Sequence, residues 1–322
     1  MTELLTRPLL APEQQDMQTR MVALMNQLAP NEGITYPGLE GVKLMRATRS
    51  LPRSPVLYEP CIVIICQGRK IGHLGEMSFV YDAQQYLVLS VPLPFESETQ
   101  ASPEEPLLGM GIGLNLSVVA ELLLALDETS GFTENEPKGI CATPMDTHLA
   151  DAICRLLQAL RSPVEMRVLG PAILREIYFR VLSGPQGSAI RAALAHRSQF
   201  SKVAKALRRI HAEYHSALDV AKLADEAGMS IPAFHATFKA VTATSPIQYV
   251  KTTRLHKARL LMVQDGVSAA VAATRVGYES ASQFSREFKR FFGRTPLEET
   301  RQMKHILEPG ETANNARYVT VQ

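Results

Sequence analysis

The sequence predicts a two-domain α+β protein, and three observations support this prediction. The chain has 322 residues, which is enough for two domains of ordinary size. Short β-branched segments separated by polar turns dominate the first half, whereas amphipathic helical patterns dominate the last third. That last third also repeats itself. We therefore predict a β-barrel or sandwich with flanking helices, followed by an all-α domain with two helix-turn-helix units joined by a long helix.

The N-terminal half divides into an arm and a β-rich domain. The arm covers residues 1–36, and its segment 13–28 has the pattern of an amphipathic helix. The domain covers residues 37–190 and has a helical C-terminal part. Its short strands, bounded by Gly, Pro, Asp or Asn, are predicted at 61–66, 79–81, 86–91 and 107–116. Its helices are predicted at 116–126, 147–160 and 163–182, the last one starting from a capping box at 162–165.

The domain predicted over residues 198–305 contains a duplicated unit. In each copy a capped short helix ends at a glycine, a second helix carries two phenylalanines four residues apart, and a Ser-Pro or Thr-Pro pair begins a third helix. The two glycines, Gly228 and Gly277, are 49 residues apart, and the two prolines, Pro246 and Pro296, are 50 apart. Residues 306–322 are predicted to be a flexible tail.

This unit has the features of a helix-turn-helix. A glycine allows the positive φ that a short turn between two steeply crossing helices requires. The phenylalanine pair is expected to pack inward, which leaves the opposite face of the second helix free to enter a DNA major groove. That face carries the candidate DNA-binding residues, which are Pro232, His235, Ala236 and Lys239 in the first copy and Ser282, Gln283, Arg286 and Arg290 in the second. Gln suits adenine and Arg suits guanine, and other basic residues contact phosphates.

Charge is distributed unevenly along the chain. Residues 198–305 contain 17 Lys and Arg against 9 Asp and Glu, whereas the rest of the chain has 17 against 23. A basic domain attached to an acidic one indicates a polyanionic partner for the basic domain, and a solvated basic surface is the alternative.

The repeat resembles the AraC/XylS family of bacterial transcriptional regulators. The resemblance rests on 228–230 (GMS), 245–249 (SPIQY), 254–261 (RLHKARLL) and above all 276–290 (VGYESASQFSREFKR), with Phe292-Gly293 and Thr295-Pro296 after it. It implies that the two units occupy successive major grooves on one side of the DNA.

The first half resembles the cupin-like N-terminal regulatory domain of the same family. The matching segments are 58–60 (YEP), 67–70 (QGRK), 79–82 (FVYD), 86–88 (YLV), 91–94 (VPLP) and 101–106 (ASPEEP). Within the family the chain is similar to regulators of aldehyde-reductase genes, which implies an aldehyde or electrophile as effector.

Few residues of the first half could form a chemical site. The four cysteines match no zinc pattern, and His73 is the one histidine in the predicted barrel, so we expect no metal and no cofactor. Cys61 and Cys66 flank a strand and point to opposite faces. They are either inert buried thiols or candidate effector and redox sites, because Arg69 and Lys70 could lower a thiol pKa. Arg46, Arg49 and Arg53 are either solvated or bind an anionic effector.

These observations lead to one functional expectation and two alternatives. No serine-protease order, phosphate loop or paired-carboxylate motif stands out, so we predict that the protein is not an enzyme. We expect a cytoplasmic activator without membrane contact that binds double-stranded promoter DNA, contacts RNA polymerase, responds to a small-molecule effector and forms a homodimer. The first alternative is a barrel enzyme fused to a DNA-binding module. The second is an N-terminal domain that serves only as a dimerisation scaffold.

Overall fold

The computed structural model describes residues 12–83, 85–127, 139–187, 190–191 and 199–307. The predicted arm up to residue 11 and the predicted tail from residue 308 lie outside this part of the chain. In the part that is described, no helix is long and apolar enough to cross a membrane.

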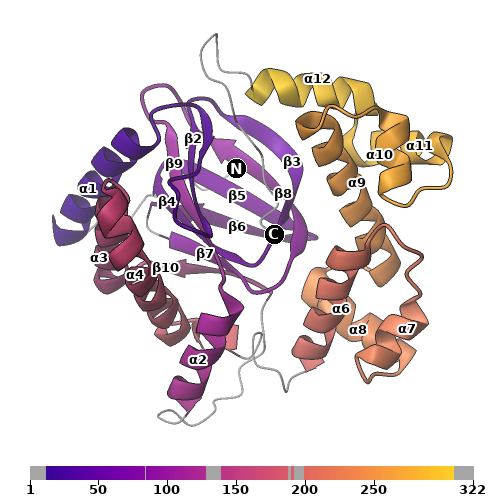
Figure 1. Ribbon diagram of the computed structural model, residues 1–322, viewed down its shortest axis with the longest axis horizontal. Coiled ribbons are helices and arrows are strands. Elements are labelled where there is room, and N and C mark those ends of the chain that lie inside the picture. The colour runs from indigo at the N-terminus through magenta and orange to yellow at the C-terminus, as the bar shows by residue number, and fades with distance from the viewer. Residues whose placement is uncertain (1–11, 84, 128–138, 188–189, 192–198, 308–322) are drawn as a thin grey trace, which may run out of the picture.

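The N-terminal half forms two antiparallel sheets that face each other (Figure 1). The six-stranded sheet has the order β1-β2-β9-β4-β7-β10, and the four-stranded sheet has the order β3-β8-β5-β6. The strands are β1 Gly33–Thr35, β2 Val42–Ala47, β3 Leu51–Tyr58, β4 Cys61–Gln67, β5 Arg69–Leu74, β6 Met77–Asp82, β7 Gln85–Leu89, β8 Leu93–Gln100, β9 Leu107–Gly113 and β10 Ile140–Pro144. The predicted class is confirmed, with one refinement: among the described strands no hydrogen-bonded pairing joins the two sheets into a closed barrel.

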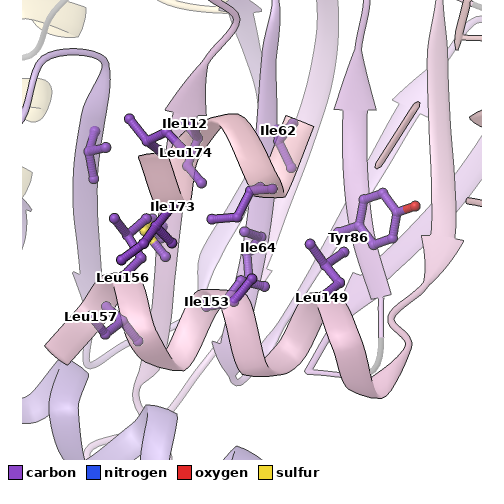
Figure 2. Packing of buried hydrophobic residues seen from close by; sticks show 14 of the residues in the cluster. Ile62, Ile64, Tyr86, Ile112, Leu149, Ile153, Leu156, Leu157, Ile173 and Leu174 are labelled. Atoms are coloured by element: carbon purple, nitrogen blue, oxygen red, sulfur yellow. The ribbon is translucent and has the colours of Figure 1, made fainter. Parts of the chain in front are cut away.

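The six-stranded sheet is buried on both faces, which explains the uninterrupted apolar sequence of β4. Ile62, Ile64 and Cys66 of this strand lie in a cluster with the N-terminal helices, whereas Val63 and Ile65 lie in a second cluster between the sheets. Figure 2 shows side chains of two consecutive helices packed against the sheet face that carries Ile62 and Ile64. They are Leu149, Ile153 and Leu156 of the first helix and Leu174 of the second. The helices are α1 Pro12–Leu28, α2 Leu116–Asp127, α3 Thr147–Ala159 and α4 Pro163–Ser183.

Several strands of the structure were not predicted from the sequence. Two of them, β3 and β10, illustrate the reasons. β3 contains Pro52 and Pro55, which are unfavourable in a central strand, and it lies at the edge of its sheet. β10 follows α2 and pairs with β7, with Cys141 opposite Val88. This pairing joins distant segments, so no local pattern could predict it.

The C-terminal half is entirely helical in its described residues. Its helices are α6 Gln199–Glu213, α7 Val220–Glu226, α8 Ile231–Thr242, α9 Pro246–Gln264, α10 Ala269–Arg275, α11 Ala281–Phe292 and α12 Pro296–Leu307. The predicted caps are present: side-chain oxygens of Asp219, Ser230, Ser245, Ser268, Ser280 and Thr295 each accept a hydrogen bond from a backbone N–H two or three residues later. Below, the first unit denotes α7 and α8, and the second unit denotes α10 and α11.

The two units are embedded differently in the molecule. Phe234 and Phe238 of the first unit belong to the same buried cluster as Leu93 and Phe95 of the four-stranded sheet. Phe284 and Phe288 of the second unit belong to a separate cluster formed within the C-terminal half. The first unit is therefore packed onto the N-terminal domain, whereas the second has its own core.

Candidate nucleic-acid interface

The second helices of the two units, α8 and α11, expose the same face. Over their first ten residues the order of exposed, half-buried and buried positions is identical in both helices. The buried positions are the phenylalanine pairs, which have no exposed surface. Each helix therefore presents to solvent the face opposite its phenylalanines, as a helix that enters a groove must.

In the second unit the candidate DNA-binding residues all reach this surface. Ser282, Gln283, Arg286 and Arg290 are exposed. The Gln283 side-chain N–H donates to Glu287 Oε1 at 3.2 Å, which leaves its other N–H and its carbonyl oxygen for further partners. Lys251 Nζ lies 3.0 Å from the same carboxylate.

Glu287 also ties α11 to its surroundings. The Tyr278 hydroxyl donates to its second oxygen at 2.9 Å. Burial alone would raise the pKa of Glu287, but hydrogen bonds from Lys251, Gln283 and Tyr278 hold it below its usual value. A charged Glu287 therefore links the turn before α11 to α9 through Tyr278 and Lys251.

In the first unit the candidate residues occupy the same face with different chemistry. Pro232, Ala236 and Lys239 are exposed and His235 is half-buried. The two helices align with an offset of 50 residues, because α8 begins at Ile231 and α11 at Ala281. With this offset, sequence reasoning missed three exposed residues of the face, namely Ala233, Ala240 and Lys289. The two prolines that follow these helices are also 50 residues apart, so the sequence alone indicates this offset.

One arginine links the second unit to α9 and to the loop after α6. On α9, the guanidinium of Arg254 donates to the backbone carbonyls of Tyr214 and Ser216, each at 2.7 Å, and to that of Gly277 at 3.1 Å. The first two carbonyls belong to the loop after α6, and the third belongs to the turn of the second unit. The orientation of the second unit relative to α6 and α9 is thus set by these three hydrogen bonds.

Gly277 is needed at this contact for two reasons. Its φ of 86° lies in the left-handed region. A Cβ at this position would also lie 2.2 Å from the backbone oxygen of His215. The equivalent Gly228 of the first unit has a φ of 60° but open space around it.

A polar cluster joins α9 and α6 to the N-terminal domain. The Tyr249 hydroxyl donates to the Pro92 carbonyl at 2.8 Å, and it lies 2.7 Å from His211 Nε2. His211 Nδ1 lies 3.3 Å from Glu59 Oε1, and Lys257 Nζ lies 3.9 Å from the same oxygen. Since the Tyr249 hydrogen is directed to Pro92, His211 Nε2–H is the donor to Tyr249.

The groups around Glu59 and Lys257 determine the charge of this cluster. Burial alone would raise the pKa of Glu59, but its contact with His211 and the positive charges of Lys257 and Lys43 hold it below its usual value. Burial lowers the pKa of Lys257, and Glu59 opposes that shift. The cluster therefore presents an ionised carboxylate of the sheet domain to the ammonium group of Lys257 in the helical domain.

A second polar contact lies further along α9. The Arg259 guanidinium donates to the Pro55 carbonyl at 3.1 Å and lies 3.4 Å from Glu299 Oε1 of α12. Its carbon lies 4.6 Å from the centre of the Phe292 ring. Strand β3 of the N-terminal domain thus contacts the helix that joins both units.

The candidate thiols of the N-terminal domain lie in the interior. Cys66 has no exposed surface and Cys61 is 8% exposed. Burial raises the pKa of each thiol to about 12. Both thiols are therefore neutral at physiological pH in this conformation.

The other candidates of the N-terminal domain have polar partners. His73 lies on β5, and its Nδ1 is 2.8 Å from the Ser78 hydroxyl. The Arg46 guanidinium donates to Asn26 Oδ1 at 2.7 Å, and Arg53 pairs with Glu96. A groove of about 370 Å³ between α3 and α4 is lined by Arg155, Gln158, Ala159, Glu165, Leu169, Ala172, Ile173 and Glu176.

Family models match both halves of the chain. One described as "AraC-type transcriptional regulator N-terminus" matches residues 38–189, and one described as "Helix-turn-helix domain" matches residues 223–302. The regulator AlkR of Acinetobacter baylyi is 33% identical over 95 residues, which are 30% of this chain and 31% of AlkR. The regulator ArgR of Pseudomonas aeruginosa is 26% identical over 182 residues, which are 54% of this chain and 55% of ArgR. The chain thus spans from about a third to somewhat over half of these relatives.

Solved structures share the fold over most of the chain. ToxT of Vibrio cholerae, bound to (E)-4-(8-methylnaphthalen-1-yl)but-3-enoic acid, matches with a TM-score of 0.58 at 12% identity, over 81% of this chain and 98% of ToxT. A ToxT structure with a bound unsaturated fatty acid matches with a TM-score of 0.55 at 12% identity, over 80% of this chain and 94% of ToxT. At this identity the likeness establishes the architecture of a β-rich domain followed by a helical domain.

Proposed function

Since this chain belongs to the AraC/XylS family of transcriptional regulators, we propose that it binds promoter DNA sequence-specifically through α8 and α11. The N-terminal domain adjusts that binding to a small molecule. The observation that carries the proposal is the repeated face: two helices, each capped by serine and fixed by a buried phenylalanine pair, expose the same ten-residue pattern.

The helix that joins the units has a suitable length for this task. α9 contains 19 residues, or about 28 Å at 1.5 Å per residue. Successive major grooves on one side of a duplex are about 34 Å apart. In the proposed complex α8 and α11 occupy two such grooves, and the Arg254 contacts hold the second unit against α9 and the loop after α6.

Regulation is proposed to act through the docked first unit. Tyr249, His211 and Glu59 connect the N-terminal domain to the two helices that support α8. With α8 held by the sheet domain and α11 held by its own core, docking restricts how both helices can adjust to DNA at once. In the undocked state α8 is released from the sheet domain. An effector that binds this state more tightly than the docked state would raise the DNA affinity, at most by the ratio of its affinities for the two states.

The effector is proposed to be a small organic molecule. ToxT, which shares the fold, has been solved with carboxylic-acid ligands. In a narrower version of the proposal, the effector is an aldehyde or another electrophile that reacts with Cys66. Because this thiol is buried, the domain must open before the reaction. In that version Cys66→Ser abolishes the response to the electrophile in a reporter assay, whereas Cys61→Ser keeps it. An unchanged response of Cys66→Ser would contradict it.

The remaining partners follow from the same proposal. The protein acts in the cytoplasm as a homodimer and activates transcription by contacting RNA polymerase. Analytical ultracentrifugation of the full chain tests the dimer. In vitro transcription from the bound promoter, with and without the protein, tests activation.

A gel shift is the experiment that tests the proposed function. Full-length protein is mixed with duplex DNA from upstream of its own and neighbouring genes, with excess competitor DNA and at several salt concentrations. We expect a complex that survives the competitor. Absence of any specific complex, with and without candidate aldehydes and fatty acids, would contradict the proposal.

The scaffold alternative makes a different prediction in the same assay. If the N-terminal domain only dimerises the chain, weakening its contact with α9 leaves the DNA affinity unchanged and no small molecule alters it. A change of DNA affinity on weakening this contact would therefore exclude a bare scaffold.

A further inference from the structure

The face of α8 that corresponds to the polar face of α11 is apolar apart from the half-buried His235 and the exposed Lys239. With the offset of 50 residues, the four candidate residues of α11 have these counterparts in α8: Ser282 corresponds to Pro232, Gln283 to Ala233, Arg286 to Ala236 and Arg290 to Ala240. All eight are exposed. Ile231, which precedes Pro232, is 48% exposed. The first unit thus keeps the geometry of the second and replaces its hydrogen-bonding groups by small apolar ones.

This replacement limits what α8 can recognise. Pro232, Ala233, Ala236 and Ala240 have no side-chain donor or acceptor, so they cannot form the bidentate pairs that select guanine or adenine. The base edges of the major groove carry one apolar group, the C5 methyl of thymine. Small side chains also allow the helix backbone to approach the bases closely.

Positive charge remains where a phosphate contact requires it. Lys239 of α8 and Lys289 of α11 occupy equivalent positions, and both are exposed. Phosphate contacts orient a helix in a groove without reading the sequence. The two helices therefore share an exposed lysine suited to a phosphate contact and differ in the other side chains of the face.

We propose that the two units read different base chemistry, with α8 selecting thymine through its methyl group and α11 selecting purines through Gln283 and Arg286. This inference rests on the proposed DNA-binding function and specifies it further. A promoter site is then asymmetric, with a thymine-rich half for the first unit and a purine-specified half for the second. The partner of the apolar α8 face is the duplex itself and not a second protein.

A selection experiment with two DNA pools tests the inference. Full-length protein is used to enrich binding sites from a randomised duplex pool made with thymidine, and in parallel from a pool made with deoxyuridine, which lacks only the methyl group. We expect two half-sites in the thymidine pool and a single half-site, that of α11, in the deoxyuridine pool. For a selected site, each thymine replaced by uracil in the α8 half should lower the affinity about fourfold, as for one buried methylene of about 0.8 kcal/mol.

Variants assign each half-site to its helix. Ala236→Arg introduces at α8 the residue that α11 has at the equivalent position, and arginine is tolerated on an exposed helix face. We expect this variant to select guanine at one base of the thymine-rich half and to lose its sensitivity to uracil there. Lys239→Ala is the matched control: it should lower the affinity for both pools by the same factor and keep the difference between them.

The outcomes separate this inference from the function on which it rests. Two half-sites enriched equally in both pools would support DNA binding and contradict methyl readout by α8. Sensitivity to uracil confined to the half-site that Arg286→Ala changes would also contradict it. A single half-site in both pools would indicate that α8 does not read bases and would contradict the inference. Enrichment in neither pool would contradict the proposed function itself.

Discussion

The two units of the helical domain have the same backbone plan and face different neighbours. The first unit shares a buried cluster with the N-terminal sheets, and its α8 face is apolar apart from Lys239 and His235. The second unit has its own core, and its α11 face carries Arg286, Lys289 and Arg290. The two copies of one fold thus differ: the first is packed against the N-terminal domain, and the second carries most of the positive charge on its exposed face.

The largest expected effect concerns the glycines of the two turns. Gly277→Ala should lower the free energy of unfolding by about 3 kcal/mol, from the positive φ at about 1–2 kcal/mol and the forced overlap with His215 at about 1–3 kcal/mol. Gly228→Ala should cost only the first contribution, because open space surrounds it. Urea unfolding of the full chain followed by circular dichroism compares the two variants. Equal losses would mean that the contact with His215 does not distinguish the units.

The next effect concerns base recognition by the second unit. Arg286→Ala should weaken binding to the selected site by about 1–3 kcal/mol if its guanidinium pairs with one guanine. Binding to unrelated DNA should change much less, which a competition gel shift measures. Arg290→Ala serves as a contrast: it should weaken binding to all sequences and reduce the salt dependence by about 0.9 in log–log slope for one lost phosphate contact. An unchanged footprint of Arg286→Ala would mean that α11 is wrongly placed in the groove.

The sequence was informative wherever a local pattern determines the structure. The capping residues, the phenylalanine pairs and the turn glycines of both units could be predicted, because each acts within a few residues of the chain. The long-range contacts that hold the two domains and the second unit in place could not be predicted. Tyr249 donates to Pro92, which is 157 residues away, and Arg254 binds carbonyls of two separate loops.

The candidate residues of the first unit show a subtler limit. Choosing Lys239 in one copy and Arg290 in the other pairs positions 51 residues apart, whereas the two helices align with an offset of 50. The prolines that follow the two helices are 50 residues apart, so this offset was visible in the sequence. Only the superposable exposure pattern of α8 and α11 made its consequence for the reading face evident.

A smaller effect is expected at the contact between the first unit and the N-terminal domain. Tyr249→Phe leaves the Pro92 carbonyl and His211 Nε2 without their hydrogen-bond partner, at a cost of about 1–3 kcal/mol to the docked state. The DNA affinity without effector should therefore rise by up to that amount, which fluorescence anisotropy with a labelled operator measures. Tyr278→Phe is the matched control in the second unit, since it removes one hydrogen bond to Glu287 and none to the N-terminal domain. A similar gain in affinity from both variants would argue against regulation through docking.

The smallest effect tests how the two recognition helices end. Ala243 ends α8 with a φ of 57°, and it is the one non-glycine residue with positive φ among those described, whereas Gly293 ends α11 at the equivalent position. Ala243→Gly removes a backbone strain of about 1–2 kcal/mol but adds about 0.4–1 kcal/mol of freedom to the unfolded chain, so we expect a net gain near 1 kcal/mol. Gly293→Ala should show the opposite sign, and differential scanning calorimetry compares both. A Cβ at Gly75 would lie 3.6 Å from the Ala243 methyl, so this methyl faces the turn between β5 and β6. A loss of stability in Ala243→Gly would therefore mean that its contact with the N-terminal domain outweighs the strain, and that docking has shaped even the end of the first recognition helix.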